Sequence, residues 1–367
     1  MQRRHILKLI GGGVVISAAA MGGFLGTRTP HHALAPWMQT DVYDDVRLNA
    51  LSYAILAPNP HNRQPWMAEL VGTDAIRIYR DTDKNLPHTD PFDRQLTIGM
   101  GCFLECLDLA LGNYGYNSST RLFPTERDSY VAEVTLYKEA AQKKNDKRLF
   151  QSILARRSNK QPFMAKPLSD AHTLAMRAYG DVYTDAKSVQ TLKDISYEAW
   201  LIEYQTPHTL QESIDLMRIG KSSINAQPDG IDLGGPLMET LNLAGVITHE
   251  ELMDPQSSAY AQGIDIYKAM LLSTPAYILV KSDDNGRADQ IKAGRRWLRL
   301  NLAATDLGLS VQPISQALQE YPEMRPHYQK IHKAFAYTGE TIQMFGRLGY
   351  GPAAAPAPRW ALEHKLI

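Results

Sequence analysis

The spacing of apolar residues predicts a long helix that is buried on nearly all sides. Over residues 94–114, leucines and other large apolar side chains recur around the whole helical circumference, which is typical of a helix in a protein interior. Residues 290–307 predict a second long helix. Each of the two follows a short stretch, 75–79 (AIRIY) or 276–280 (AYILV), that reads as a strand. The chain therefore predicts the order strand, then buried helix, twice.

The rest of the pattern predicts mainly helices. Further helices are predicted over 44–56, 146–157, 188–223 and most of the residues up to 272, with a further strand over 131–137. Pro58 and Pro60 end the first of these helices, because proline has no amide hydrogen to donate. The loop 225–230 interrupts the helical region, and the Pro- and Ala-rich tail 349–358 predicts an irregular segment along a surface.

The two buried helices also resemble each other in sequence. The segments GMGCFLECLDLALGNYGY and KAGRRWLRLNLAATDLGL align without gaps at a constant offset, which pairs Gly101 with Gly294 and Gly115 with Gly308. We interpret this as a duplicated α+β unit, in which two copies packed about a pseudo-twofold axis imitate a homodimer. Sites at their junction would take residues from both halves. The alternative is two unrelated buried helices with a shared Leu, Ala and Gly bias.

Residues 1–26 predict a targeting segment. Arg3 and Arg4 carry the twin-arginine pattern, and the apolar stretch 9–25 that follows is only mildly hydrophobic because it contains five glycines. That combination favours a twin-arginine export signal over a stable membrane span. An uncleaved N-terminal anchor is the alternative. The triplet 33–35 (ALA) offers a small-x-small cleavage site, against which the following Pro36 argues.

This signal predicts where the protein works. We expect it to be periplasmic, or otherwise exported through the twin-arginine machinery, and to be tethered to the membrane if the signal stays uncleaved. The twin-arginine route carries folded proteins, and its use often reflects a cofactor that is inserted before export. The predicted export signal is therefore a first indication that the protein binds a cofactor.

Composition narrows the classes of function. The 367 residues, 44% of them hydrophobic, are ample for a buried core and about two domains. Lys plus Arg equals Asp plus Glu at 39 each, so no global field would attract nucleic acid. Cys102 and Cys106 lie one turn apart in a predicted buried helix, where disulfide geometry is poor, and predict small core residues. No zinc spacing, HExxH, GxSxG or Walker A motif occurs.

Two short segments could carry chemistry. The first, 155–163 (ARRSNKQPF), holds Arg156, Arg157, Ser158 and Lys160 within five residues, a set that suits the phosphate of a bound cofactor. The alternative is a basic, solvated helix end that complements the helix dipole.

The second segment is the loop 56–66 (LAPNPHNRQPW). Its prolines stiffen the backbone, and Asn59, Asn62 and Gln64 present amides that could read the edge of a heterocycle. An ordinary Pro/Asn turn is the alternative.

Together these segments resemble one family. APNPHNRQPW resembles a loop of nitroreductase-like flavoproteins, and ARRSNKQPF resembles the Arg-x-Ser-x-basic motif with which that family grips the FMN phosphate. The segment 310–316 (SVQPISQ), the motif 347–350 (RLGY) and Arg359 resemble later parts of the same pattern. The set covers most of residues 45–360. Because the loop lies in one half and the Arg-Ser motif in the other, the chain looks like the tandem, Acg-type branch with one FMN per chain.

The resemblance implies a role for each residue. The phosphate would be bound by Arg156, Ser158 and Lys160, with Arg359 closing over it and Arg157 nearby. The flavin or ribityl edge would be met by Asn59, Asn62 and Gln64. The backbone N–H near Gln316 would face the flavin N5. No side chain acts as acid or base, because the flavin carries the redox chemistry. The implied organisation is a signal over 1–35, a first half over 41–140, and a second half over 146–360 with a helical insertion or lid.

The implied function is flavin-mediated electron or hydride transfer to a small organic acceptor such as a nitroaromatic or a quinone. Ordinary members take hydride from NAD(P)H, which is not supplied in the periplasm, so an exported protein would need another donor such as a quinol or a redox partner. A different class of function is FMN sequestration without turnover, which the long insertion between residues 161 and 272 suggests. A third alternative is a structural relic that binds nothing.

Overall fold

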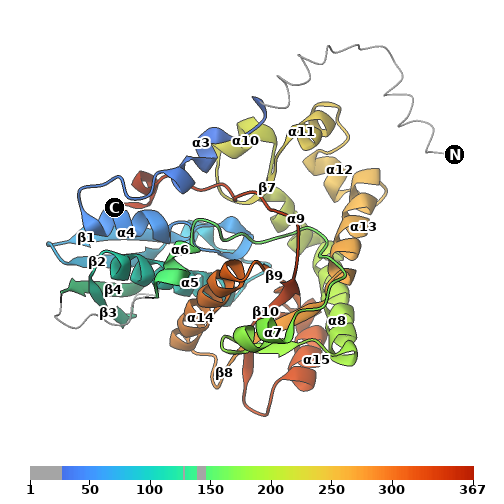
Figure 1. The fold of residues 1–367 in the computed structure, drawn as a ribbon. Coiled ribbons are helices and arrows are strands. Elements are labelled where there is room, and N and C mark those ends of the chain that lie inside the picture. Colours follow the sequence, from blue (N-terminus) through green and yellow to red (C-terminus); the bar gives the residue numbers. More distant parts are fainter. Residues whose placement is uncertain (1–26, 127–128, 139–145) are drawn as a thin grey trace.

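The computed structural model describes residues 27–126, 129–138 and 146–367. The twin-arginine pattern and the apolar stretch 9–25 lie outside these residues. The described chain is α+β, with two four-stranded sheets, two long helices packed between them, and a helical layer on one side (Figure 1).

The first half contains one sheet and its helices. Its elements are α3 (His31–Leu34), the 3-10 helix η1 (Ala35–Met38), α4 (Val46–Ala54), η2 (Pro60–Asn62), β1 (Trp66–Val71), β2 (Ala75–Arg80), η3 (Thr82–Lys84), α5 (Arg94–Asn113), β3 (Asn117–Leu122) and β4 (Tyr130–Tyr137). The strand order is β1-β2-β4-β3, and every neighbouring pair is antiparallel. Strands β1 and β3 are absent from the predictions, since their polar and apolar positions alternate only weakly.

The second half repeats this plan. Outside the insertion its elements are α6 (Lys147–Gln151), α7 (Asp170–Arg177), β5 (Asp181–Tyr183), β8 (Ala276–Ser282), α14 (Arg287–Asp306), β9 (Ser310–Pro313), η4 (Gln316–Leu318), η5 (Pro322–Met324), α15 (Arg325–Phe335) and β10 (Thr341–Gly349). The strand order β5-β8-β10-β9, again antiparallel throughout, matches that of the first sheet strand for strand.

The duplication that the sequence predicted is confirmed by the positions of the elements. Helices α5 and α14 begin 193 residues apart, at Arg94 and Arg287, and end 193 residues apart as well. Strands β3 and β9 begin at the same offset. Two α+β units with the same strand order therefore pack against each other within one chain.

The two long helices cross at the paired glycines. A Cβ atom on Gly101 would lie 2.3 Å from the carbonyl oxygen of Ile291, and one on Gly294 would lie 1.9 Å from that of Ile98. Only glycine allows backbones to approach so closely. Helix α5 alone among the helices of the described residues has the length and hydropathy to cross a membrane, but 89% of its apolar window is buried in the core.

The two cysteines lie on α5 as predicted, buried and reduced. Their thiols donate to the carbonyl oxygens of Gly294 and Tyr53. Burial raises the pKa of both, to about 12 for Cys106. They are small core residues, as the sequence predicted.

A helical insertion separates β5 from β8. It comprises α8 (Ala186–Gln205), α9 (Pro207–Asp215), β6 (Met217–Ile219), α10 (Gly220–Ala226), β7 (Ile231–Leu233), α11 (Pro236–Leu243), α12 (His249–Met253) and α13 (Ser258–Leu272). The helical region predicted over 188–223 is interrupted, because Pro207 starts a new helix and the short strand β6 pairs in parallel with β7. A proline fits the first turn of a helix but breaks its interior.

The C-terminal tail returns to the first half. Residues 350–361 form no regular element, as predicted for 349–358, and the short helix η6 (Leu362–Lys365) follows. The amide of Ile367 then donates to Ala68 in β1 at 3.0 Å. The tail thus crosses from the second sheet to the first, passing the loop 56–66 on its way (Figure 1).

Candidate functional site

Two buried arginines meet where the first half, the second half and the tail come together. Arg156 and Arg359 are only 4% and 3% exposed, and we call them the arginine pair. Their guanidinium groups donate to the same carbonyl oxygen, that of Leu56, at 3.1 and 3.2 Å. Arg359 also donates to the side-chain oxygen of Asn62 at 2.6 Å.

The arginine pair carries charge without a counter-ion. None of the ion pairs among the described residues involves Arg156 or Arg359. The buried Nη1 of Arg156 and Nε of Arg359 have no hydrogen-bond partner. Burial lowers the pKa of Arg156 to about 10. Burial and the charge of Arg156 together lower the pKa of Arg359 to about 9, with Asp232 opposing the shift. Buried like charges are costly unless an anion compensates them.

The structure places the residues of the segment 155–163 in different surroundings, and their contacts with a phosphate stay predictions. The helix predicted over 146–157 ends at Gln151, and the chain then turns so that Arg156 points inward. Ser158 forms a parallel bridge with Val311 in β9, which fixes the segment beside the second sheet. Lys160 is exposed and does not join the arginine pair.

Residues near the start of the described chain cover the arginine pair. The guanidinium carbon of Arg157 lies 4.6 Å from the ring centre of Trp37, and that of Arg359 lies 5.5 Å from the same ring. The carbonyl oxygen of Ala33 accepts from the amide of Arg359, and the amide of Ala33 donates to Asn225. Ala33 is 1% exposed, whereas Leu34 and Ala35 are half-buried, so the small-x-small triplet 33–35 lies partly inside the fold.

The loop 56–66 is strained. His61, Asn62 and Gln64 all have positive φ, at 46°, 52° and 50°, a conformation that costs free energy for residues with a Cβ. Asn59 closes the loop on itself by accepting from the Gln64 amide at 2.7 Å. Strain of this kind persists only where the surroundings hold it, and it clusters at functional sites.

The amides of this loop are engaged by protein groups. Gln64 donates to the carbonyl oxygen of Pro228 at 2.7 Å and accepts from the amide of Trp360 at 3.0 Å. Asn62 joins the loop to the tail, because its side-chain oxygen accepts from Arg359 and its side-chain nitrogen donates to the carbonyl oxygen of Pro358. The structure therefore gives Gln64 and Asn62 the task of positioning the loop against the tail and the insertion. The predicted contacts of Asn59, Asn62 and Gln64 with a ring edge stay predictions.

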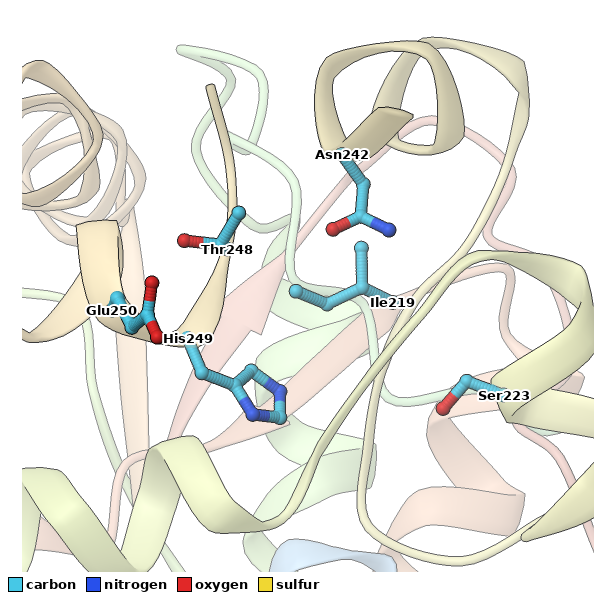
Figure 2. Close-up of a pocket in the computed structure, with 6 residues that line it drawn as sticks. All are labelled: Ile219, Ser223, Asn242, Thr248, His249 and Glu250. Atoms are coloured by element: carbon cyan, nitrogen blue, oxygen red, sulfur yellow. The ribbon is translucent and has the colours of Figure 1, made fainter. Parts of the chain in front are cut away.

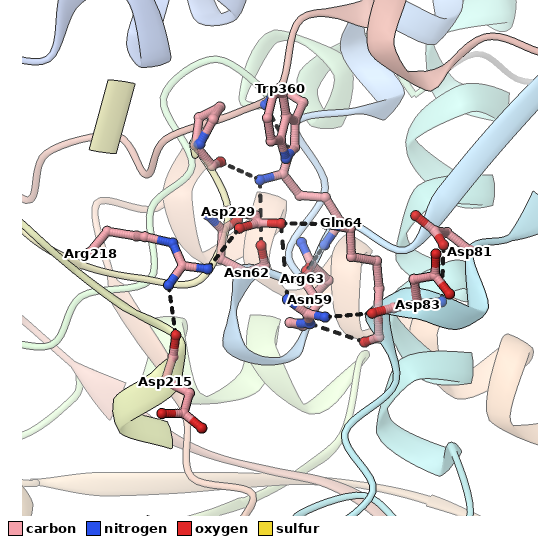
Figure 3. A network of polar contacts seen from close by, with 12 residues as sticks. Asn59, Asn62, Arg63, Gln64, Asp81, Asp83, Asp215, Arg218, Asp229 and Trp360 are labelled. Carbon is pink, nitrogen blue, oxygen red and sulfur yellow. Dashed lines mark hydrogen bonds and ion pairs between the residues drawn. The ribbon is translucent and has the colours of Figure 1, made fainter. Parts of the chain in front are cut away.

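A buried carboxylate ties the insertion to this loop (Figure 3). The side chain of Asp229 is fully buried and accepts from Lys84 at 2.7 Å and Arg218 at 3.2 Å, with Arg63 at 4.0 Å. Burial raises the pKa of Asp229, but the hydrogen bond from Lys84 and the three cations outweigh it, so that the net shift is downward. The sequence analysis treated the loop 225–230 only as an interruption of the helical region and missed the role of Asp229.

His61 faces a second group of titratable residues. Its buried Nδ1 has no hydrogen-bond partner. Burial lowers the pKa of His61 to about 4, with Lys160 and Arg63 adding to the effect and Glu212 opposing it. His61 is therefore neutral at pH 7, and it presents an unpaired ring nitrogen beside the loop.

Gln316, whose backbone N–H was expected to face the flavin N5, begins η4. Close to it lies Glu203 of α8, which accepts from Gln319 at 2.8 Å. Burial raises the pKa of Glu203 to about 7. Sequence reasoning missed this residue, because a single Glu in a helix carries no local signal.

Two cavities lie in and beside the insertion. One, of about 390 Å³, lies between α10, α11 and α12 and is lined by Ile219, Ser223, Asn242, Thr248, His249 and Glu250 (Figure 2). The other, of about 380 Å³, lies between residues 85–88 and α9, with His88, His208 and Glu212 in its wall. Neither is lined by a residue that the sequence predicted for the cofactor.

Comparison with known proteins identifies relatives but no family model. No protein-family model matches the chain. A Mycobacterium tuberculosis protein named "Putative NAD(P)H nitroreductase" is 24% identical over 333 residues, which cover 85% of this chain and 88% of the relative. A second from the same organism, carrying that name with the suffix acg, is 27% identical over 129 residues, or 35% of this chain and 39% of that protein. The chain is thus similar over most of its length to a protein named as a nitroreductase.

Solved structures with the same kind of name are also similar. One from Anabaena variabilis, described as a "putative nitroreductase", has a TM-score of 0.45 and 12% identity, covering 87% of this chain and 91% of that one. One from Desulfitobacterium hafniense, a nitroreductase with bound FMN, has a TM-score of 0.35 and 14% identity. The match covers 59% of this chain and 95% of that one.

Proposed function

We propose that the protein is a nitroreductase-like oxidoreductase that binds FMN, with the phosphate of the cofactor held by Arg156 and Arg359. The observation that carries the proposal is the arginine pair itself, buried, without a carboxylate partner, and with one unpaired N–H group on each guanidinium. A phosphate supplies both the negative charge and the acceptor oxygens that these groups lack. The similarity to a protein named as a nitroreductase over 85% of the chain supports the same function.

The residues around the arginine pair have distinct tasks in this proposal. Arg157 stacks on Trp37 at the edge of the site, and Trp37 excludes water from the buried charges. Asn62 and Gln64 orient the strained loop. Bound FMN would supply the electron and hydride chemistry, and the backbone N–H near Gln316 remains the proposed neighbour of the flavin ring.

The proposed acceptor is a small organic molecule of the nitroaromatic or quinone type. The relatives are named for a nicotinamide donor, and NAD(P)H is the first donor to test. If the twin-arginine pattern exports the protein, a quinol or a redox partner takes that place. Export and the periplasmic location are part of the proposal, since the pattern lies in residues 1–26.

The test is flavin binding by arginine variants of the full chain. We expect Arg156→Gln and Arg359→Gln to lose the visible flavin absorption, while the flavin-free proteins keep their thermal midpoint because each substitution removes an uncompensated buried charge. The control is Arg148→Gln, whose side chain is 74% exposed and pairs with Asp306. Stoichiometric flavin in both pair variants would overturn the assignment.

FMN storage is the second candidate function, and one observation favours it. Trp37 and the tail residues from Pro358 to Trp360 cover the arginine pair, so two separate segments close the site. Rapid bleaching of the bound flavin by dithionite or NADH, followed by reoxidation with a quinone, would exclude storage. Bound flavin that neither reagent reaches would exclude turnover.

A further inference from the structure

Helix α11 and the turn after it expose an apolar surface. No residue of α11 is buried, and Leu237, Leu243 and Val246 are 66%, 74% and 37% exposed. Between Pro236 and Ile247 the sequence contains a single charged residue, Glu239. We call this surface the α11 face. Several exposed apolar residues in one short segment with a single charge mark a surface that a partner covers.

The one charge in this stretch is neutralised by the N-terminal segment. The guanidinium of Arg28 pairs with the carboxylate of Glu239 at 2.8 Å. Lys221 of α10 donates to the carbonyl oxygen of Thr27, also at 2.8 Å. Residues 27 and 28 are thereby fixed to α10 and α11, next to the α11 face.

The position of this attachment indicates what lies against the face. The apolar stretch 9–25 contains no charged residue and ends only two residues before Thr27. The hydrogen bonds of Ala33 with Arg359 and Asn225 hold the segment 27–38 against the body of the protein. Whatever environment receives the stretch 9–25 is therefore held close to Leu237 and Leu243.

We propose that the α11 face docks on a lipid bilayer, in the interface beside the point where the stretch 9–25 enters the same membrane. A leucine-rich helix without net charge places its apolar side chains at the boundary of headgroups and acyl chains. A weak surface suffices there, because the tether makes docking an intramolecular event with a high effective concentration. Glu250 lines the same cavity as Asn242 of α11, and its negative charge favours zwitterionic over anionic lipid. The proposal does not depend on the proposed cofactor.

The test measures the depth of two matched positions in a membrane. Full-length Leu243→Cys carries a fluorescent label and is reconstituted in phosphatidylcholine vesicles that contain lipids with nitroxide on the acyl chain. The control is Leu174→Cys, which is 71% exposed against 74% for Leu243 and lies on α7 at the opposite end of the molecule (Figure 1). The native cysteines are buried and stay unlabelled.

We expect the label at 243 to lose most of its fluorescence and the label at 174 to keep it. Leu237→Cys serves as a second position on the face, should the first variant fold poorly. Equal quenching at 243 and 174, or none at 243 and 237, would overturn the proposal. Disulfide-linked dimers of Leu243→Cys in the absence of vesicles would assign the face to a second copy of the chain and would overturn it too.

Discussion

At the scale of single residues, the site is defined by groups whose bonding is incomplete. Two buried guanidinium groups share one carbonyl oxygen and lack an anion, and a buried ring nitrogen of His61 lacks any partner. Native proteins leave few buried polar atoms without a hydrogen-bond partner, so each such atom needs a physical explanation. The proposed phosphate explains the arginine atoms.

His61 leads to a prediction about pH. Its pKa of about 4 lies below the 6.5 of an ordinary histidine, so between pH 4 and 6.5 the unfolded chain binds more protons at this residue than the folded one. Stability should therefore fall as the pH is lowered through this window. His61→Gln should lose less stability over the same range, as followed by urea unfolding at several pH values.

The same histidine can be observed directly. In the NMR spectrum, the ring signal that disappears in His61→Gln should titrate near pH 4. His249, which is exposed on α12, serves as the reference. A His61 signal that titrates near pH 6.5 would show that its ring is solvated.

At the scale of elements, the close crossing of α5 and α14 determines how the two halves pack. We expect Gly101→Ala to cost at least about 3 kcal/mol of unfolding free energy, since overpacking against a backbone cannot be relieved by a side-chain rotation. The control is Gly286→Ala, where the nearest atom belongs to the side chain of Asp289 at 3.3 Å. Equal midpoints of urea unfolding for the two variants would contradict the crossing geometry.

The attachment of the insertion to the loop 56–66 gives a second prediction at this scale. Asp229→Asn should destabilise the protein by about 3–5 kcal/mol, because it leaves buried cations without their carboxylate. The control is Asp265→Asn, which changes an exposed carboxylate of α13. Because the pKa of Asp229 is lowered, its contribution is present above the ordinary value of 3.8 and is lost as the pH falls through the folded pKa. The difference between wild type and Asp229→Asn should therefore shrink in acid.

At the scale of the whole molecule, the duplication brings distant segments to one place. The arginine pair combines a residue that follows α6, a carbonyl group of the first half and a residue of the C-terminal tail. The second-half loop 225–230 packs against Asn62 and Gln64 instead of forming an equivalent site. The proposed site is therefore assembled once, from residues of both halves.

This asymmetry predicts a stoichiometry. We expect one FMN per chain when the absorbance of flavin released by denaturation is compared with the peptide concentration. The Arg359→Gln protein, treated identically, provides the blank. Two flavins per chain would show that the second half holds a site of its own.

The sequence by itself determined the elements that depend on local pattern. The two buried helices, the 193-residue offset between them and the irregular tail all appear in the structure as predicted, because apolar periodicity is a local signal. Pro207 is also a local signal for a break between two helices, but the helical pattern on both sides of it led to the prediction of an uninterrupted helical region. The cluster of basic residues over 156–160 can be recognised in the sequence, but the directions in which its side chains point cannot.

Only the tertiary structure decided which of those residues face inward. Arg156 is buried while Lys160, four residues on, is exposed, and Arg359 joins Arg156 from about 200 residues away. The left-handed conformation of Gln64 is held by partners as distant as Pro228 and Trp360. Contacts of this kind depend on where the chain returns after long loops, and no local periodicity encodes that.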